Sequence, residues 1–358
     1  MQRHIAVLLA VLIVVSAFAP TAAGQSNAEP ESTVDVSCEY PLELTDATGQ
    51  TITLEERPES IVALQASDTQ TVFEIGAEDR LVGMPYSPAT SEFDRGDRVN
   101  IGDGWTVNHE RVVSLNPDIV LAANATKQAD IEQLRDAGLT VYHLEEAQSL
   151  EDVRENVKTV GKLTGECDGA EETITWMDDQ LEIVERTLNG TERPTAYYAM
   201  GDGYTAGSGT FINEALTTAG MTNLAAEAGV QSYNQINPET VVNEDPDWII
   251  YPDDRETAPI HESVEATSAY QNDNVLAVNA NHISQPAPRV VYAITDIVET
   301  VHPEAYAEAS EELDDAPEGG NTSDDQTDDQ SNDSIPGFGV PAALIAMLAA
   351  AGFIARRR

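Results

Sequence analysis

The sequence is poor in basic residues. Its 358 residues include 18 Lys and Arg against 63 Asp and Glu, a formal net charge of -45, and only three of the basic residues are lysines. Such a chain lacks the basic surface that neutralises phosphates, so we exclude a nucleic-acid-binding protein. The same deficit argues against binding to anionic membranes through a basic surface. The acidic excess is typical of a halophilic source, because concentrated salt screens the repulsion between surface carboxylates.

Cysteine is also scarce. Cys38 and Cys167 are the only two, and two cysteines alone cannot form a tetrahedral structural metal site. In an exported chain such a pair predicts one disulfide, which here would tie the N-terminal region to the middle of the chain. The alternative is a pair of free thiols.

Sequence motifs of enzymes are missing as well. There is no G-x-S-x-G motif. Residues 201–206 (GDGYTA) fit a G-x-G-x-x-A pattern, but no acidic residue closes a following strand at the distance that a dinucleotide site needs. The histidines beyond the N-terminal segment show no H-E-x-x-H spacing; they are His109, His143, His261, His282 and His302. We therefore expect no catalytic residues, no cofactor and no metal site.

Both ends of the chain carry targeting signals. Residues 1–24 combine a basic start, an apolar run and a small-residue cleavage site, which predicts a secretory signal peptide. Residues 308–335 are acidic and free of aromatics, which predicts a disordered stalk because they cannot bury enough apolar surface to fold. Residues 336–358 contain a Pro-Gly-Phe tripeptide, an apolar stretch and three terminal arginines.

This three-part tail resembles the PGF-type sorting signal of haloarchaeal surface proteins. In that class the apolar tail is removed and a lipid is attached near the cut. A plain C-terminal transmembrane anchor is the alternative. In both cases we expect an extracytoplasmic protein held at the outer face of the cell membrane. Four N-x-S/T sequons are candidate glycosylation sites; they lie at Asn124, Asn189, Asn321 and Asn332.

Two α/β halves occupy the middle of the chain. Residues 25–57 are an N-terminal segment with a β-hairpin, since alternating stretches flank a glycine-containing turn. Short apolar strands then alternate with helical stretches over residues 58–166 and again over 191–307, which predicts parallel sheets with covered faces. Residues 167–190 have the longest helical periodicity and predict a linking helix. The expected fold class is α/β, with two Rossmann-like lobes joined by one long helix.

The expected elements can be stated by residue. The strands should cover residues 61–64, 81–83, 119–122 and 141–144 in the first lobe, and 195–200, 248–251 and 275–278 in the second. The helices should cover residues 69–75, 128–137, 150–163, 210–219, 238–243, 261–268 and 288–302.

An internal similarity supports two equivalent lobes. Residues 111–121 (RVVSLNPDIVL) match residues 240–250 (TVVNEDPDWII), and each stretch predicts a short helix, a proline that ends it, an aspartate and a buried strand. Chance similarity between two ordinary helix-to-strand turns is the alternative. Equivalent placement in both halves favours duplication or parallel architecture.

Three stretches resemble the cobalamin and ferric-siderophore binding proteins of ABC importers. Residues 60–83 (SIVALQASDTQTVFEIGAEDRLVG) resemble the first strand, loop and helix of that family. Residues 116–122 (NPDIVLA) resemble a second landmark, and residues 207–220 (GSGTFINEALTTAG) resemble the opening of its second lobe. The resemblance covers about residues 40–305. It implies a clam-shell binding protein with little hinge motion that delivers a bulky metal chelate to a permease and its ATPase. We expect it to act as a monomer.

The resemblance also implies one acidic residue on each lobe that pairs with arginines of the permease. On the second lobe the matching position is Glu214. On the first lobe it is Gln70, which departs from the family pattern, and Glu74 lies one helical turn later. Glu74 and Glu214 are the candidate docking residues, although both could be ordinary solvated acids.

Loops at the carboxyl ends of the predicted strands should line a cleft between the lobes. Aromatic faces suit a planar chelate, and the candidate ligand-binding residues are Tyr86, Trp105, Tyr204, Tyr233 and Arg289. The only cations in these loops are Lys127, Arg255 and Arg289. Many ferric siderophores are anionic and need an Arg-lined pocket, whereas cobalamin carries little net charge. Charge therefore favours cobalamin over a ferric siderophore.

Two other functions fit the sequence less well. A related class of binding proteins captures zinc or manganese with several histidines and acids, and the scattered histidines could converge in the fold. A non-transport surface-layer protein predicts short repeats, and the sequence has none.

Overall fold

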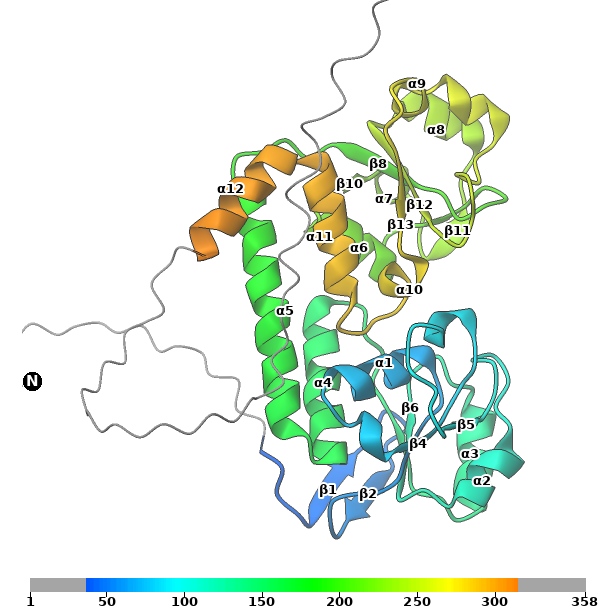
Figure 1. The fold of residues 1–358 in the computed structure, drawn as a ribbon. Coiled ribbons are helices and arrows are strands. Elements are labelled where there is room, and N and C mark those ends of the chain that lie inside the picture. The colour runs from blue at the N-terminus through cyan, green and yellow to red at the C-terminus, as the bar shows by residue number, and fades with distance from the viewer. Residues whose placement is uncertain (1–36, 315–358) are drawn as a thin grey trace, which may run out of the picture. The chain divides into compact units, whose positions relative to one another are not determined.

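The computed structural model describes residues 37–314 and shows two α/β lobes along one long helix (Figure 1). The expected fold class is confirmed. The expected signal peptide, the sequons at Asn321 and Asn332, and the sorting segment all lie outside the described residues.

The first lobe is built on a five-stranded parallel sheet in the order β5-β4-β3-β6-β7. Its strands are β3 (Ile61–Ala63), β4 (Leu81–Met84), β5 (Val99–Asn100), β6 (Ile119–Ala122) and β7 (Val141–His143). Its helices are α1 (Ala66–Glu74), η1 (Glu78–Arg80), η2 (Pro88–Thr90), α2 (His109–Leu115), α3 (Gln128–Asp136) and α4 (Leu150–Thr164). Every residue of β3 and β6 is buried, as expected for central strands covered by helices on both faces.

The second lobe has a four-stranded parallel sheet in the order β10-β8-β12-β13 and a separate antiparallel pair, β9 with β11. Its strands are β8 (Thr195–Tyr198), β9 (Tyr204–Ala206), β10 (Thr222–Asn223), β11 (Tyr233–Gln235), β12 (Trp248–Pro252) and β13 (Val275–Val278). Its helices are α6 (Phe211–Thr218), α7 (Leu224–Glu227), α8 (Pro238–Glu244), η3 (Glu262–Ala266), α9 (Ser268–Gln271), α10 (Ala280–Ile283), α11 (Val290–Val301) and α12 (Pro303–Asp314).

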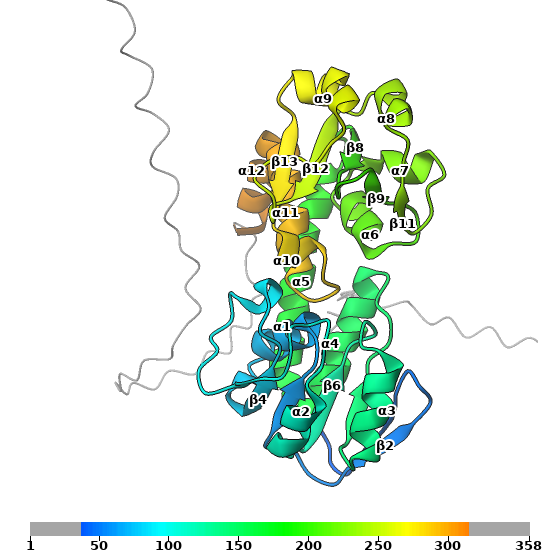
Figure 2. The ribbon, with the colours of Figure 1, turned by 90° about the vertical axis from the view of Figure 1, so that its right-hand side faces the viewer.

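Helix α5 (Cys167–Leu188) joins the lobes (Figures 1 and 2). It packs against α4 of the first lobe and against α11 and α12 of the second. Its residues Ile174, Met177 and Val184 are buried in a hydrophobic cluster that also contains strand residues from both sheets. The lobes therefore share a core along α5, which is the linking helix that the periodicity of residues 167–190 predicted.

The internal similarity corresponds to the same turn in both lobes. Asn116 and Asp245 end α2 and α8 in the left-handed conformation, with φ of 45° and 44°. Two residues later in each case, Asp118 accepts a hydrogen bond from the backbone N–H of Ser60 (2.9 Å), and Asp247 accepts one from the N–H of Thr195 (2.8 Å). Each aspartate thus fastens the start of the neighbouring parallel strand, which supports equivalent lobes over chance similarity.

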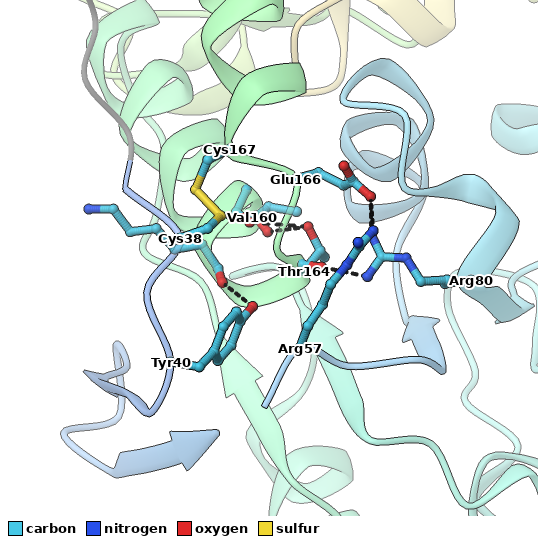
Figure 3. The surroundings of a disulfide bond; sticks show 10 residues. Cys38, Tyr40, Arg57, Arg80, Val160, Thr164, Glu166 and Cys167 are labelled. Carbon is cyan, nitrogen blue, oxygen red and sulfur yellow. Dashed lines mark hydrogen bonds and ion pairs between the residues drawn. A yellow bond between two sulfur atoms is a disulfide. The ribbon is translucent and has the colours of Figure 1, made fainter. Parts of the chain in front are cut away.

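A disulfide fastens the N-terminal segment to the junction of α4 and α5 (Figure 3). Cys38 and Cys167 form this bond, as predicted. Beside it, the Tyr40 hydroxyl donates a hydrogen bond to the carbonyl of Lys162 (2.9 Å). The hairpin of β1 (Leu42–Thr45) and β2 (Thr51–Leu54) follows directly, as the sequence also predicted.

The same junction carries an ion-pair cluster. Arg57 and Arg80 both pair with the carboxylate of Glu166, between α4 and α5 (Figure 3). Gly165 ends α4 with φ of 74°, and a Cβ there would lie 2.8 Å from Cγ of Arg57. A glycine at this position allows both the turn and the close approach of the arginine.

Three details differ from the expectations. The stalk does not begin at residue 308, because α12 continues to Asp314, with Ala309 buried and Tyr306 packed against the core. Tyr204 and Tyr233 lie on strands rather than loops. Residues 262–266 form a 3-10 helix, η3, rather than the start of an α-helix.

Candidate functional site

The carboxyl ends of the two sheets meet. Asn281, which follows β13, approaches the carbonyl of Pro88, which follows β4, at 3.5 Å. The loops at these ends are where parallel sheets bind ligands. The candidate site is therefore built from the loops that follow the strands of both lobes.

Asp68 lies at the centre of the first-lobe edge. The chain leaves β3 toward β4 and β5 and later returns to β6 on the other side, so the topological switch point falls between β3 and β6. One oxygen of Asp68, Oδ2, accepts hydrogen bonds from the N–H of Gln65 after β3 and of Ala123 after β6, both at 3.0 Å. Burial raises the pKa of this carboxyl to about 7, despite those hydrogen bonds. Its other oxygen has no hydrogen-bond partner among the described residues.

Trp105 projects from a loop that hydrogen bonds hold in place. The carboxylate of Asp103 accepts from the N–H groups of Trp105 (2.9 Å) and Thr106 (2.8 Å), and these bonds hold the pKa of Asp103 below its usual range. Lys127 donates to the Trp105 carbonyl at 3.1 Å. The Trp105 side chain is nevertheless 84% exposed. The loop therefore presents a bare indole on a fixed backbone, which suits stacking against a flat ligand.

Tyr86 is less available than the sequence suggested. Its hydroxyl donates to the carbonyl of Arg98 (2.6 Å), and the guanidinium of Arg95 lies 4.4 Å from its ring centre. The residue lines a hollow of about 570 Å³ together with Asp103 and His109. Its hydroxyl and one ring face are thus occupied within the protein, although it lies near the Trp105 loop.

Tyr204 and Tyr233 lie on the ribbon of β9 and β11. They are 47% and 48% exposed. Tyr204 is paired with Gln235, and Tyr233 with Ala206. Because residues paired directly, or two apart on one strand, share a face, both rings project from the same side of the ribbon. The second lobe thus offers two neighbouring aromatic rings.

A hollow of about 700 Å³ lies at the strand ends of the second lobe. It is lined by loops after β8, β11 and β12, including Gly201, Asn237, Arg255 and His261. The Arg255 guanidinium lies against Gly201, where a Cβ would be 3.3 Å from Nη1. Its ion pair with Asp254 is long, 3.6 Å, and its side chain is 47% exposed. Arg255 is thus a cation directed into this hollow.

The sequence suggested that Arg289 binds the ligand and that Glu74 docks the permease, in separate sites. In the structure the two residues form an ion pair with each other. The Nε of Arg289 donates to Glu74 (2.7 Å) and its Nη1 to Glu92 (2.8 Å). The guanidinium also lies 4.6 Å from the ring centre of Phe93. Two first-lobe carboxylates already neutralise Arg289, so it is not a free cation for a ligand, and Glu74 is not a free acid.

Glu214 and Gln70 differ in their surroundings. Glu214 lies in the first turn of α6, is partly exposed and forms no ion pair with the described residues. Gln70 is 2% exposed and its side-chain oxygen accepts from the N–H of Arg289 (2.8 Å). Gln70, the position that matches the first-lobe acid, is therefore buried. Of the two candidate docking residues, Glu214 is available to a partner, whereas Glu74 is paired with Arg289.

Asp68 and Asp103 were missed as functional candidates. The Asp-Gly-Trp sequence at residues 103–105 is a turn signal that could have identified Asp103. Nothing local marks Asp68, because its contact with Ala123 spans 55 residues.

Three further features concern the described residues as a whole. Within residues 37–314 there is no group of three or more His, Cys, Asp or Glu that could hold a metal ion. No helix in the same range is long and apolar enough to cross a membrane. Asn124 and Asn189 are exposed, and their glycosylation stays a prediction.

Comparison with known proteins identifies relatives along the whole chain. The sequence pattern of the periplasmic binding protein family matches residues 61–285, and the PGF-CTERM motif matches residues 335–358. The chain is 36% identical, over 366 aligned residues, to a cobalamin-binding protein of Halobacterium salinarum, with 98% of each chain covered.

Solved structures show the same fold. The periplasmic vitamin B12 binding protein of Vibrio cholerae superimposes with a TM-score of 0.59 at 21% identity, covering 71% of this chain and 98% of that one. The apo periplasmic heme-binding protein of Roseiflexus superimposes with a TM-score of 0.61 at 22% identity, covering 70% and 99%. These structures carry different ligands in their names, so the fold alone does not select the ligand.

Proposed function

Because the chain belongs to the periplasmic binding protein family, we propose that it captures cobalamin between its lobes and delivers it to an ABC permease. The observation that carries this proposal is the set of exposed rings at the strand ends, Trp105 on the first lobe and Tyr204 and Tyr233 on the second. Such faces suit a bulky planar chelate. The relative from Halobacterium salinarum, named as a cobalamin-binding protein, supports the choice of ligand.

The charges at the strand ends favour cobalamin over an anionic siderophore. Lys127 is bonded to the Trp105 carbonyl, and Arg289 is held by two carboxylates. Arg255 is the remaining cation of the three in these loops. Of these three loop cations, Arg255 alone is therefore available to an anionic chelate.

Titration with cyanocobalamin tests the ligand. Calorimetry and tryptophan fluorescence should show saturable binding, with a ferric hydroxamate siderophore and hemin as competitors that bind more weakly. Trp105→Ala should weaken binding. The control is Tyr270→Ala, because Tyr270 is also an exposed aromatic residue, at 40%, but lies on α9, before β13 and so at the opposite edge of the sheet. No binding of cyanocobalamin at high micromolar concentration, or stoichiometric zinc in the purified protein, would overturn the proposal.

Docking to the permease is assigned to Glu214. Its carboxylate is partly exposed and lacks an ion pair within the described residues, so it is available to an arginine of a partner. Glu214→Arg should abolish cobalamin uptake by cells while leaving affinity for cyanocobalamin unchanged, and Glu265→Arg on η3 is the matched charge control. Unchanged uptake would remove Glu214 from the docking surface. Glu74→Arg should impair uptake too, but it also removes one of the two carboxylate partners of Arg289.

The PGF-CTERM motif supports attachment at the cell surface. The folded part would act as a monomer at the outer face of the membrane, held by the C-terminal tail. A chain that ends at residue 335 should then appear in the medium rather than in the membrane fraction.

A further inference from the structure

Arg289 connects the two lobes through four contacts. It belongs to the second lobe, at the start of α11, whereas its partners Gln70, Glu74, Glu92 and Phe93 all belong to the first. Figures 1 and 2 both place the turn between α10 and α11 beside α1. One side chain thus binds α1 and the segment after η2 at once.

Two residues of α10, Asn281 and His282, also contact Glu92. Asn281 Nδ2 lies 3.4 Å from Glu92 Oε1, and His282 Nε2 lies 3.7 Å from Glu92 Oε2. Burial acts to raise the pKa of Glu92, but Asn281, His282 and Arg289 together hold it below the usual range. Burial lowers the pKa of His282, against the attraction of Glu92. Arg289 therefore supplies the permanent positive charge that the second lobe offers to the two carboxylates.

The cluster is partly shielded from solvent. The side chains of Arg289, Glu74 and Glu92 are 23%, 21% and 36% exposed. Partly buried charge pairs are screened by salt much less than exposed ones. The contact should therefore persist in the concentrated salt that the composition indicates.

We propose that Arg289 is a latch: a positioning residue that fixes the angle between the lobes and slows the escape of bound ligand. The shared core along α5 joins the lobes, but a single helix leaves bending and twisting modes open. Charge-assisted bonds from Arg289 to α1 and to Glu92 oppose those modes. This proposal rests on the proposed function only for the ligand, because the lobe angle can be measured without one.

Distance measurements between the lobes test the latch. Both native cysteines are in the disulfide, so spin labels can be placed at Glu132→Cys on α3 and Glu244→Cys on α8 without competing thiols. Both positions are exposed. Without ligand, pulsed electron paramagnetic resonance should give a narrow distance distribution for the labelled chain with Arg289. The same labels in Arg289→Met should give a broader, shifted distribution. The matched control is Arg186→Met, because Arg186 pairs with Glu182 within α5 and not across the lobes.

Release kinetics provide the second measurement. The dissociation rate constant of cyanocobalamin should be on the order of tenfold higher for Arg289→Met, with the association rate constant nearly unchanged. Arg289→Lys should release cyanocobalamin more slowly than Arg289→Met but faster than the native protein. Lysine keeps the positive charge but lacks the planar guanidinium that donates to both carboxylates. If Arg289→Met is unstable, Glu92→Gln removes one arm of the latch and leaves Arg289 paired with Glu74.

The two proposals can fail separately. Unchanged distance distributions in Arg289→Met and Glu92→Gln would overturn the latch, whatever the ligand. Absence of cyanocobalamin binding to the native chain, with a broadened distribution in Arg289→Met, would overturn the ligand and leave the latch standing.

Discussion

Carboxylates fasten strand ends in both lobes, but the first lobe presents its exposed ring on a loop, whereas the second lobe carries its rings on a two-stranded ribbon. Asp68 ties the loops after β3 and β6, and Asp103 with Lys127 holds the Trp105 loop. Tyr204 and Tyr233 instead stand on β9 and β11, which lie outside the four-stranded sheet. Within this ribbon, β9 is anchored by the buried Thr205 and Ala206, whereas all three residues of β11 are exposed. One face of the site is thus preorganised, and the other carries Tyr233 on an exposed strand that can adapt to what binds.

The disulfide belongs wholly to the first-lobe side of this comparison. Replacing Cys38 and Cys167 by serine should lower the free energy of unfolding by about 3–5 kcal/mol, because the crosslink closes a loop of 129 residues in the unfolded chain. Denaturant unfolding in high-salt buffer measures the loss, and reduction of the native protein should reproduce it. Amide exchange should accelerate in β1 and β2 and stay slow in β12 and β13. Equal acceleration in both lobes would show that they open as one unit.

The pH dependence of the free energy of unfolding tests the role of the buried Asp68 carboxyl at the strand ends of the first lobe. Its pKa rises from 3.8 unfolded to about 7 folded, so between these values the native state keeps a proton that the unfolded state has lost. The free energy of unfolding should therefore fall as pH rises from about 4 to about 7 and level off above. Asp68→Asn cannot ionise and still offers one oxygen to both N–H groups. The variant should lack this slope and gain about 4 kcal/mol over the native protein at pH 8.

Asp103 serves as the control for Asp68, because its effect on the free energy of unfolding changes with pH in the opposite direction. The pKa of Asp103 is lowered by hydrogen bonds from Thr106 and Trp105, so its contribution is present above the ordinary pKa and lost as pH falls through the folded one. Asp103→Asn should therefore weaken the protein at neutral pH and not in acid. An Asp68→Asn variant that keeps the native pH slope would remove this carboxylate from the explanation.

The sequence predicted the architecture well and the site only in part. Buried runs such as residues 119–122 and the periodicity of residues 167–190 act locally, so strands, helices and lobes followed from pattern. Trp105 lies in a loop as expected, because the Asp-Gly pair before it is a local turn signal. The pairing of Arg289 with Glu74 was not predictable, because it joins residues 215 positions apart and depends on how closely the lobes approach. The hydroxyl bond of Tyr86 to Arg98 was not predictable either, because it depends on how the loop between β4 and β5 folds back.

The aromatic rings give the most direct test of a rigid against an adaptable face. Trp105→Ala should weaken cyanocobalamin binding about tenfold, because a large ring on a fixed loop costs little to order on binding. Tyr233→Ala should cost about threefold, because the ribbon can shift and Tyr204 can compensate from the same face. Calorimetry of each variant, with thermal melts to show that the fold is intact, measures both. Equal losses would mean that the two faces are equally rigid.

The paired aspartates of the internal repeat give the smallest and cleanest contrast between the lobes. Asp118 accepts from the N–H groups of Glu59 and Ser60 and from the Ser60 hydroxyl, at 3.0, 2.9 and 2.8 Å, whereas Asp247 has one such bond, to Thr195. Each aspartate is exposed, so water can replace part of what is lost. Asp118→Ala should cost about 1.5 kcal/mol of unfolding free energy and Asp247→Ala about 0.5 kcal/mol, measured by denaturant unfolding. If the second variant loses as much as the first, the turn itself rather than the number of bonds sets the stability, and the two lobes are more alike than their hydrogen bonds indicate.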